Sequence, residues 1–175
     1  TMNVFAEALI WFSRGISTIP IRHRSKVAAV RWSEYTKRLP TPDEIVRWFG
    51  RPLFTNYGIL TGKRHGQPGY LLVIDFDDLT AGADWLVGTG CQTYAVQTAR
   101  GLHAYFLTDE PAPTARFAGG DLKAGGYVLG AGSIHPNGWQ YRVLIDAPIA
   151  NIRSIYEVLP DLPKPEPQPK PPPIP

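Results

Sequence analysis

The stretch Leu71-Leu72-Val73-Ile74-Asp75-Phe76-Asp77-Asp78 decides the fold. Five of the six residues before Asp77 are apolar, and no polar alternation interrupts them until the acids, which predicts a strand buried on both faces. Side chains two apart on a strand point the same way, so Asp75 and Asp77 are expected on one face and Phe76 on the other. Their Cβ atoms would then lie about 6–7 Å apart, twice the strand rise.

Two carboxylates at that spacing repel each other unless a cation lies between them. A divalent ion that prefers oxygen ligands, Mg²⁺ or Mn²⁺, would meet this need. The alternative is that the acids only end the strand and begin a turn into a helix at Leu79-Thr80-Ala81. Asp78 points away from Asp77 on a strand, and we predict that it has no metal role.

The composition is that of a globular protein. With 43% hydrophobic and 19% charged residues, the 175-residue chain suits one domain, or two small lobes that share a core. The single cysteine, Cys91, excludes a disulfide framework and a cysteine-based zinc site. No apolar run reaches the roughly 18–20 residues that span a bilayer, and no signal peptide pattern is present. We therefore expect a soluble, cytoplasmic protein.

The net charge of +3 is unevenly distributed along the chain. Residues 1–64 hold 11 Lys and Arg against 4 Asp and Glu, a balance of +7, and residues 65–175 hold 7 against 11, a balance of −4. A basic first part beside an acidic second part favours a polyanionic ligand such as a nucleic acid. The alternative is scattered surface charge without a ligand.

Hydrophobic periodicity and turn residues predict both helices and strands. Helices are predicted at 4–14, 31–37, 42–49, 81–87 (closed by Gly88) and 152–159 (with Asn151 as N-cap), strands at 16–21, 56–62, 71–76, 92–97, 102–107, 126–129 and 139–144, and a loop at 111–120. Strands 92–97 and 102–107 should form an antiparallel hairpin. Because strands and helices do not alternate as strict βαβ units, the predicted fold class is α+β with a mixed or antiparallel central sheet.

The last sixteen residues, 160–175, include nine prolines. Proline donates no backbone hydrogen bond and favours the extended polyproline II conformation. We expect a domain at 2–159, made of an N-terminal lobe at about 2–66 and a metal-binding lobe at about 67–159, followed by a linker at 160–175 to a further region. A ligand for an SH3-type domain is the alternative for this segment.

Three segments after the acidic strand carry polar residues that suit phosphate or metal chemistry. They are Arg100-Gly101-Leu102-His103, then Gly120-Asp121-Leu122-Lys123 before a glycine turn, and Gly132-Ser133-Ile134-His135. Taken alone, each of these residues has an ordinary structural interpretation, such as a histidine satisfied in the core. Their order along the chain is more informative than any one of them.

Together and in this order, these segments resemble the primase-polymerase branch of the archaeo-eukaryotic primase superfamily, of the bifunctional DNA primase/polymerase N-terminal type. The matching elements are Lys26 with Trp32, Thr61-Gly62, Val73-Ile74-Asp75-Phe76-Asp77, and the segments 98–106, 121–128 and 132–141. The resemblance covers nearly everything from Ala6 to Tyr141. One position departs from the family pattern, because Gly101 stands where serine is common.

The resemblance implies an RRM-like catalytic sheet with a helical, basic N-terminal lobe, and a template-dependent nucleotidyltransferase that makes or extends DNA or RNA primers. Its substrates would be dNTPs or NTPs, and its template single-stranded or primed DNA. The implied ligands of two Mg²⁺ or Mn²⁺ ions are Asp75, Asp77 and Asp121. The residues expected at the nucleotide are Arg100, His103, Lys123, Ser133 and His135, and those expected on nucleic-acid phosphates are Arg22, Arg24, Lys26, Lys63 and Arg64. The proline-rich segment would lead to a helicase region of the full-length chain.

Two other functions fit the same residues. A metal-dependent nuclease or phosphodiesterase also suits three aspartates and a histidine. A nucleic-acid-binding module could keep the sheet without catalysis, although acids at all three positions count against it. Priming without a primer and extension of an existing primer are both compatible with these motifs.

Overall fold

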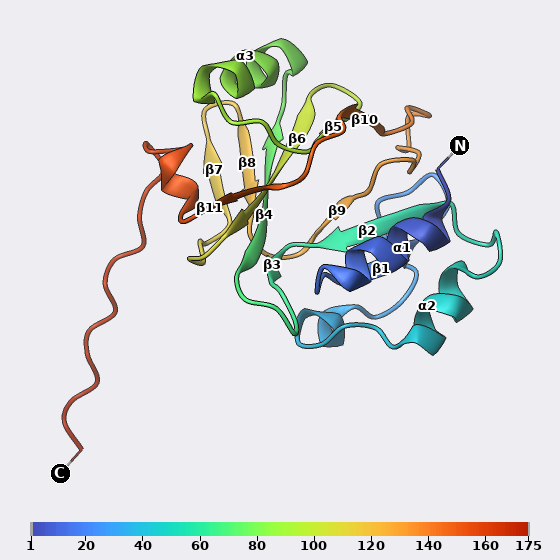
Figure 1. Ribbon diagram of the computed structural model, residues 1–175, viewed down its shortest axis with the longest axis horizontal. Coiled ribbons are helices and arrows are strands. Elements are labelled where there is room, and N and C mark those ends of the chain that lie inside the picture. Colours follow the sequence, from blue (N-terminus) through green and yellow to red (C-terminus); the bar gives the residue numbers. More distant parts are fainter. Residues whose placement is uncertain (1, 175) are drawn as a thin grey trace.

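The buried strand predicted before Asp77 is β4 (Tyr70–Phe76), an inner strand of the larger of two sheets in the computed structural model, which describes residues 2–174 (Figure 1). The larger sheet has the order β10-β5-β6-β4-β8-β7, with β11 beside β6 and β3 beside β4. Its other strands are β3 (Gly62–Lys63), β5 (Ala95–Gln97), β6 (Leu102–Thr108), β7 (Ala115–Phe117), β8 (Gly120–Lys123), β10 (Arg142–Ile145) and β11 (Ala150–Ile152). Strand β4 is antiparallel to both of its long neighbours, β6 and β8.

The smaller sheet has the order β1-β2-β9 and packs with the N-terminal helices. Its strands are β1 (Thr18–Ile21), β2 (Asn56–Leu60) and β9 (Tyr127–Leu129), and the helices beside it are α1 (Val4–Ser13), the short η1 (Ser33–Thr36) and α2 (Pro42–Phe49). Strand β1 lies at the sheet edge, as expected for a strand that contains Pro20. Strand β9 comes from the later part of the chain, so it ties the two sheets together. The fold is therefore α+β, as predicted.

Local capping explains where the helices begin and end. The Thr41 hydroxyl accepts from the Glu44 backbone while the Glu44 carboxylate accepts from the Thr41 backbone, the capping box predicted for α2. The carboxylate of Asp78 accepts from the Ala81 amide at 2.9 Å and caps α3 (Leu79–Thr89). The end predicted for this helix at Gly88 was wrong, because the left-handed residue that ends it is Gly90, with φ +64°.

Two segments differ from the sequence prediction. Residues 111–120, predicted as a loop, contain β7, a three-residue edge strand held by pairing with β8. The predicted helix at 152–159 was also wrong. Residues 150–152 form β11, which pairs in parallel with β6, and only the short η2 (Ile155–Glu157) follows, capped by Ser154. In both places pairing with a distant strand outweighs the local pattern.

The two faces of the larger sheet bury separate apolar clusters. Leu71 and Val73 of β4 pack with the smaller sheet and α1, whereas Leu72, Ile74 and Phe76 pack beneath α3 and the C-terminal segment. The second cluster extends to three residues after β11, which are Ile155, Leu159 and Leu162. Strand β4 is thus buried on both faces, as predicted.

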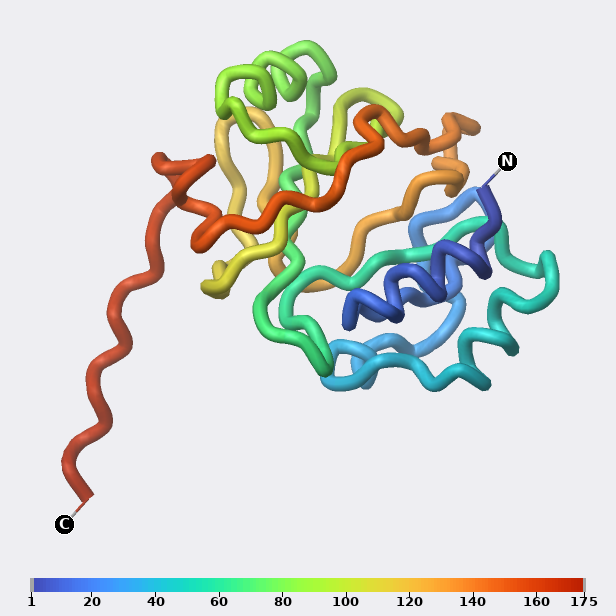
Figure 2. Tube along the Cα trace, in the orientation of Figure 1, coloured from blue at the N-terminus to red at the C-terminus, as the bar shows by residue number. Residues whose placement is uncertain are grey.

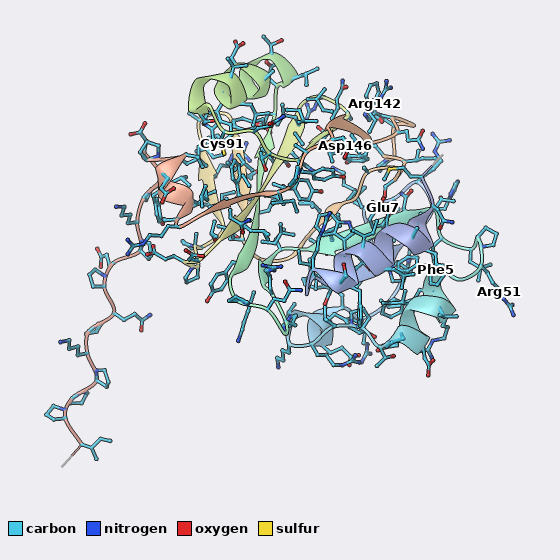
Figure 3. All side chains as sticks on the ribbon, viewed as in Figure 1. Phe5, Glu7, Arg51, Cys91, Arg142 and Asp146 are labelled. Carbon is cyan, nitrogen blue, oxygen red and sulfur yellow. The ribbon has the colours of Figure 1, made fainter. Side chains whose placement is uncertain are left out.

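Residues 163–174 leave the body of the protein as an exposed, extended tail (Figure 2). The tail departs from the side covered by α3 and the C-terminal segment; Lys164 still lies over the Tyr156 ring, and the side chains farther along project into solvent (Figure 3). Cys91, also labelled in Figure 3, is a partly buried free thiol just after α3. Among residues 2–174, no helix has the length and apolar character that crossing a bilayer requires.

Candidate active site

The register of the larger sheet brings charged residues of four adjacent strands into one row. Asp75 of β4 lies opposite Asp121 of β8 on one side and opposite His103 of β6 on the other. On the next strand, β7, Arg116 lies opposite Asp121. Residues directly opposite each other on antiparallel strands project from the same face. The row Arg116–Asp121–Asp75–His103 therefore lies on the face turned toward the smaller sheet.

His103 and Asp75 form a close pair at the inner end of this row. The His103 Nε2 lies 3.4 Å from the Asp75 Oδ1, with the histidine side chain 6% exposed and the aspartate side chain 29% exposed. The His103 Nδ1 is buried and has no hydrogen-bond partner among residues 2–174. The ring thus has one polar contact in this part of the structure, the carboxylate of Asp75.

The surroundings of Asp75 keep its carboxyl group ionised. Burial raises the pKa of Asp75, but the hydrogen bond and positive potential from His103 oppose burial. The charges of Lys123 and Lys26 add to that opposition, and the net pKa of Asp75 lies below its ordinary value. A partly buried carboxylate that is held in its charged form is the state that a cation ligand requires.

Arg116 contacts two of the predicted metal ligands. Its Nη1 lies 3.2 Å from both carboxylate oxygens of Asp121, and its Nη2 lies 3.8 Å from the Asp77 Oδ2. Arg116 was not predicted as a site residue, because the segment that forms β7 was predicted as a loop. The signal that could have revealed it is the Gly119-Gly120 pair, which marks a hairpin turn between two short runs.

Asp77 lies just beyond the end of β4 and lines the same cleft as Asp75. Strand β4 ends at Phe76, and the Asp77 amide donates to the Gly119 carbonyl at 2.9 Å. The strand thus ends at the predicted residue, and the side chain of Asp77, 53% exposed, meets Asp121 through their shared partner Arg116.

The three acids have the chemistry of a divalent-cation site, although they do not converge as metal ligands in this arrangement. Among residues 2–174, no three His, Cys, Asp or Glu side chains are grouped closely enough to hold a metal ion. Oxygen ligands of this kind suit Mg²⁺ or Mn²⁺. The guanidinium of Arg116 acts as a stand-in cation for Asp77 and Asp121. The residues therefore supply the type of ligand that such an ion prefers, and Arg116 holds the place of a cation beside two of them.

A cleft of about 200 Å³ lies between the row and the smaller sheet. Asp75, Asp77 and His103 line it, as do Tyr127 of β9 and Tyr141 just before β10. Four further lining residues were predicted from the sequence to contact phosphate groups: Lys26, Arg100, Lys123 and His135. Fold and register thus bring together residues that are more than one hundred positions apart in the chain.

Ser133 is not among the cleft residues. Its side chain is fully buried, and its hydroxyl accepts from the Tyr57 amide at 3.1 Å and lies 3.4 Å from the Tyr57 carbonyl. These contacts join the segment after β9 to β2. The predicted contact of Ser133 with a nucleotide is not supported by this position, and we assign the residue a structural role.

The basic residues predicted to bind nucleic acid divide into distinct positions. Lys26 lines the cleft, and its carbonyl accepts from the Tyr127 hydroxyl at 2.7 Å, which holds the basic loop against β9. Arg22 and Arg24 are exposed on the same loop, and Lys63 is exposed on β3.

Arg64 makes internal contacts instead. Its guanidinium donates to the carbonyls of Arg14 and Pro68 and to the side chain of Gln67. These contacts hold the segment after β3 against the end of α1. The predicted role of Arg64 on nucleic acid is therefore not supported by its surroundings.

Two glycines allow the neighbouring strands to approach the end of β4. A Cβ atom at Gly101 would lie 1.7 Å from the Phe76 carbonyl oxygen, and one at Gly120 would lie 1.8 Å from the Asp75 carbonyl oxygen. Neither contact is possible without moving the backbone. Gly101, where serine is common in the family that the sequence resembles, thus lies where this protein leaves no room for a side chain.

The fold and the cleft define an α+β protein with a row of acids on one sheet and a rim of basic residues around it. The sequence profile of the family described as bifunctional DNA primase/polymerase, N-terminal (Prim-Pol), matches residues 8–164. The match covers most of the chain, and the protein belongs to the Prim-Pol family. No curated protein matches the sequence.

Proposed function

We propose that this protein is a template-dependent nucleotidyltransferase that makes or extends DNA or RNA primers from dNTPs or NTPs. The observation that carries the proposal is the direct opposition of Asp75 and Asp121 beside a cleft with a basic rim. Membership of a DNA primase/polymerase family supports the same reaction.

The acids are proposed as the ligands of Mg²⁺ or Mn²⁺. Asp75, Asp77 and Asp121 would hold the metal, and His103 would keep Asp75 ionised and oriented. When bound, two divalent ions would activate the attacking 3′-oxygen and stabilise the leaving pyrophosphate. Because His103 is buried against Asp75, we assign it this positioning role in place of the phosphate contact predicted from the sequence.

The basic residues of the cleft are proposed to bind the nucleotide. Lys26, Arg100 and Lys123 bring positive charge to the cleft that Asp75 lines, and a triphosphate needs charged donors of this kind. His135, which lines the same cleft, is a further candidate. Lys26 moves to this group from the residues predicted to contact template.

The template is proposed to run along the basic first part of the chain. Arg22 and Arg24 are exposed on the loop that carries Lys26 to the cleft, and residues 1–64 have a balance of +7. Contacts between such residues and phosphates bind nucleic acid without reading its sequence. The tail would connect this module to a helicase region of the full-length chain.

An extension assay distinguishes the proposed function from its alternatives. The protein is incubated with labelled dNTPs or NTPs and Mn²⁺ or Mg²⁺, on a template with and without an annealed primer. Elongation supports the proposal, shortening of the primer supports a nuclease, and binding without turnover supports a non-catalytic module. Product formed without a primer shows priming.

Variants of the row connect the activity to the site. We expect Asp75→Asn, Asp77→Asn and Asp121→Asn to abolish elongation without unfolding the protein. Asp84→Asn is the matched control, because Asp84 is an exposed acid on α3, away from the cleft. Full elongation by any of the first three would remove that residue from the proposed metal site.

A further inference from the structure

Arg116 occupies a position that the proposed reaction does not explain. It lies on the edge strand β7, and the register places it directly opposite Asp121. A surface arginine unrelated to the site would point into solvent, but the side chain of Arg116 points toward the acids. It contacts Asp121 with Nη1 and reaches Asp77 with Nη2.

The position of Arg116 gives it the electrostatic role that a bound cation would have. Asp77 and Asp121 belong to different strands or turns, and Arg116 is the basic side chain that contacts both within residues 2–174. Without a positive charge, these two carboxylates and nearby Asp75 would repel one another. A divalent ion that binds the same oxygens must compete with the guanidinium for them.

The surroundings of Arg116 allow the side chain to leave. It is 72% exposed, so its departure opens no core. Arg116 also lines a groove of about 460 Å³ between α3, β7 and residues 158–163, and Asp161 lines the same groove. The residue therefore borders open space on the side away from the row, in a groove that also holds an acidic residue.

We propose that Arg116 is an internal counter-ion, which holds Asp77 and Asp121 together in the metal-free protein and is displaced when a divalent cation binds. Because it assumes that these acids take such a cation, the role of Arg116 rests on the proposed function. Arg116 is a positioning residue in this scheme. It sets the metal affinity of the site and prevents the acids from separating before the metal arrives.

Manganese binding in the absence of nucleotide and template tests this role. The whole chain is titrated with Mn²⁺ by calorimetry, and free Mn²⁺ is measured in parallel by electron paramagnetic resonance. We expect Arg116→Gln to bind Mn²⁺ about three- to tenfold more tightly than wild type, the range for removing one or two exposed ion pairs. Arg116→Lys keeps the charge without the two-pronged geometry, so its Mn²⁺ affinity should lie between those of wild type and Arg116→Gln.

The matched control is Arg153→Gln. Arg153 is 77% exposed and pairs with Glu110 at 3.2 Å, so it resembles Arg116 in exposure and contact distance but lies away from the row. Its substitution should leave Mn²⁺ affinity unchanged. Thermal unfolding provides a second readout. In EDTA, Arg116→Gln should melt below wild type, and the rise in melting temperature on adding Mn²⁺ should be larger.

The possible outcomes separate this role from the proposed function. Equal or weaker Mn²⁺ binding by Arg116→Gln, with wild-type binding that Asp121→Asn removes, overturns the role of Arg116 and leaves the metal site intact. Absence of Asp121-dependent Mn²⁺ binding in wild type and in all the arginine variants overturns both. Tighter binding by Arg153→Gln as well would also overturn a role specific to Arg116.

Discussion

The contact between Asp75 and His103 can be measured by replacing each residue with alanine, singly and together. The double-mutant cycle removes the losses that come from the cavities alone and leaves the interaction between the two side chains. We expect the pair to contribute about 1 kcal/mol to the free energy of unfolding at pH 7. The geometry of the pair sets this value.

A hydrogen bond to a charged group contributes about 1.5–3 kcal/mol. The Nε2–Oδ1 distance of 3.4 Å is longer than the best range of about 2.7–3.2 Å, which lowers the expected value. The aspartate side chain is 29% exposed, so water screens it in part, whereas the histidine is almost fully buried. Together these features favour a coupling below the usual range and clearly above zero.

The pH dependence gives a second test with a defined sign. The pKa of Asp75 is lowered in the folded protein, so its stabilisation is present above the unfolded pKa of about 3.9 and is lost as the pH falls through the folded pKa. In His103→Ala, burial still raises the pKa of Asp75 while its main opposition is absent. The variant should therefore lose stability at a higher pH than wild type.

Urea unfolding of the four proteins across the range from pH 7 to pH 3 measures both effects. The free energies at pH 7 give the coupling, and the pH series gives the order in which wild type and His103→Ala lose stability. A coupling within about 0.3 kcal/mol of zero, which is the additivity error of such cycles, would refute the contact. If His103→Ala loses stability at the same acidic pH as wild type, the assigned electrostatic role of His103 is refuted.

Three further predictions follow from packing and charge. Gly101→Ala should lower the free energy of unfolding by about 3 kcal/mol or more, because its Cβ would overlap the Phe76 carbonyl. Gly88→Ala, with nothing near its Cβ inside α3, should raise the free energy of unfolding by about 0.5–1 kcal/mol. Equal effects of the two substitutions in urea unfolding would contradict the packing described at Gly101. Ser133→Ala should lose about 1–3 kcal/mol of stability while the nucleotide KM is unchanged in the extension assay, and a raised KM would return Ser133 to the nucleotide site. Arg22→Gln with Arg24→Gln should reduce the slope of log K against log salt for single-stranded template by about 1.4, alike on every sequence, and an unchanged slope would remove the loop from the template path.

The central strand and its hairpin partner could be predicted from the sequence because their patterns are long and local. The apolar run before Asp77 corresponds to β4, and the turn at 98–101 joins β5 and β6 as expected. What the sequence cannot supply is the register between strands. The alignment of Asp75 with His103 and Asp121 depends on pairing between segments that are about thirty to fifty residues apart.

The features that were missed are those that only long-range contacts determine. Strand β7 has three residues and exists through its pairing with β8, so Arg116 did not stand out in the sequence. Ser133 has the appearance of an active-site hydroxyl in its glycine-rich segment, and only its contacts with the Tyr57 backbone reveal a structural role.

The tail leaves the protein from the face of the larger sheet opposite Asp75, which has a practical consequence for surface-based experiments. The last packed residue is Leu162, beneath the cluster that α3 covers, and residues 163–174 extend away from it (Figure 1). A biotin attached at Lys170→Cys, in a background where Cys91→Ser removes the native thiol, would tether each molecule from the side away from Asp75. The cleft would then be clear of the attachment point, open to a DNA strand and to nucleotides during single-molecule recording.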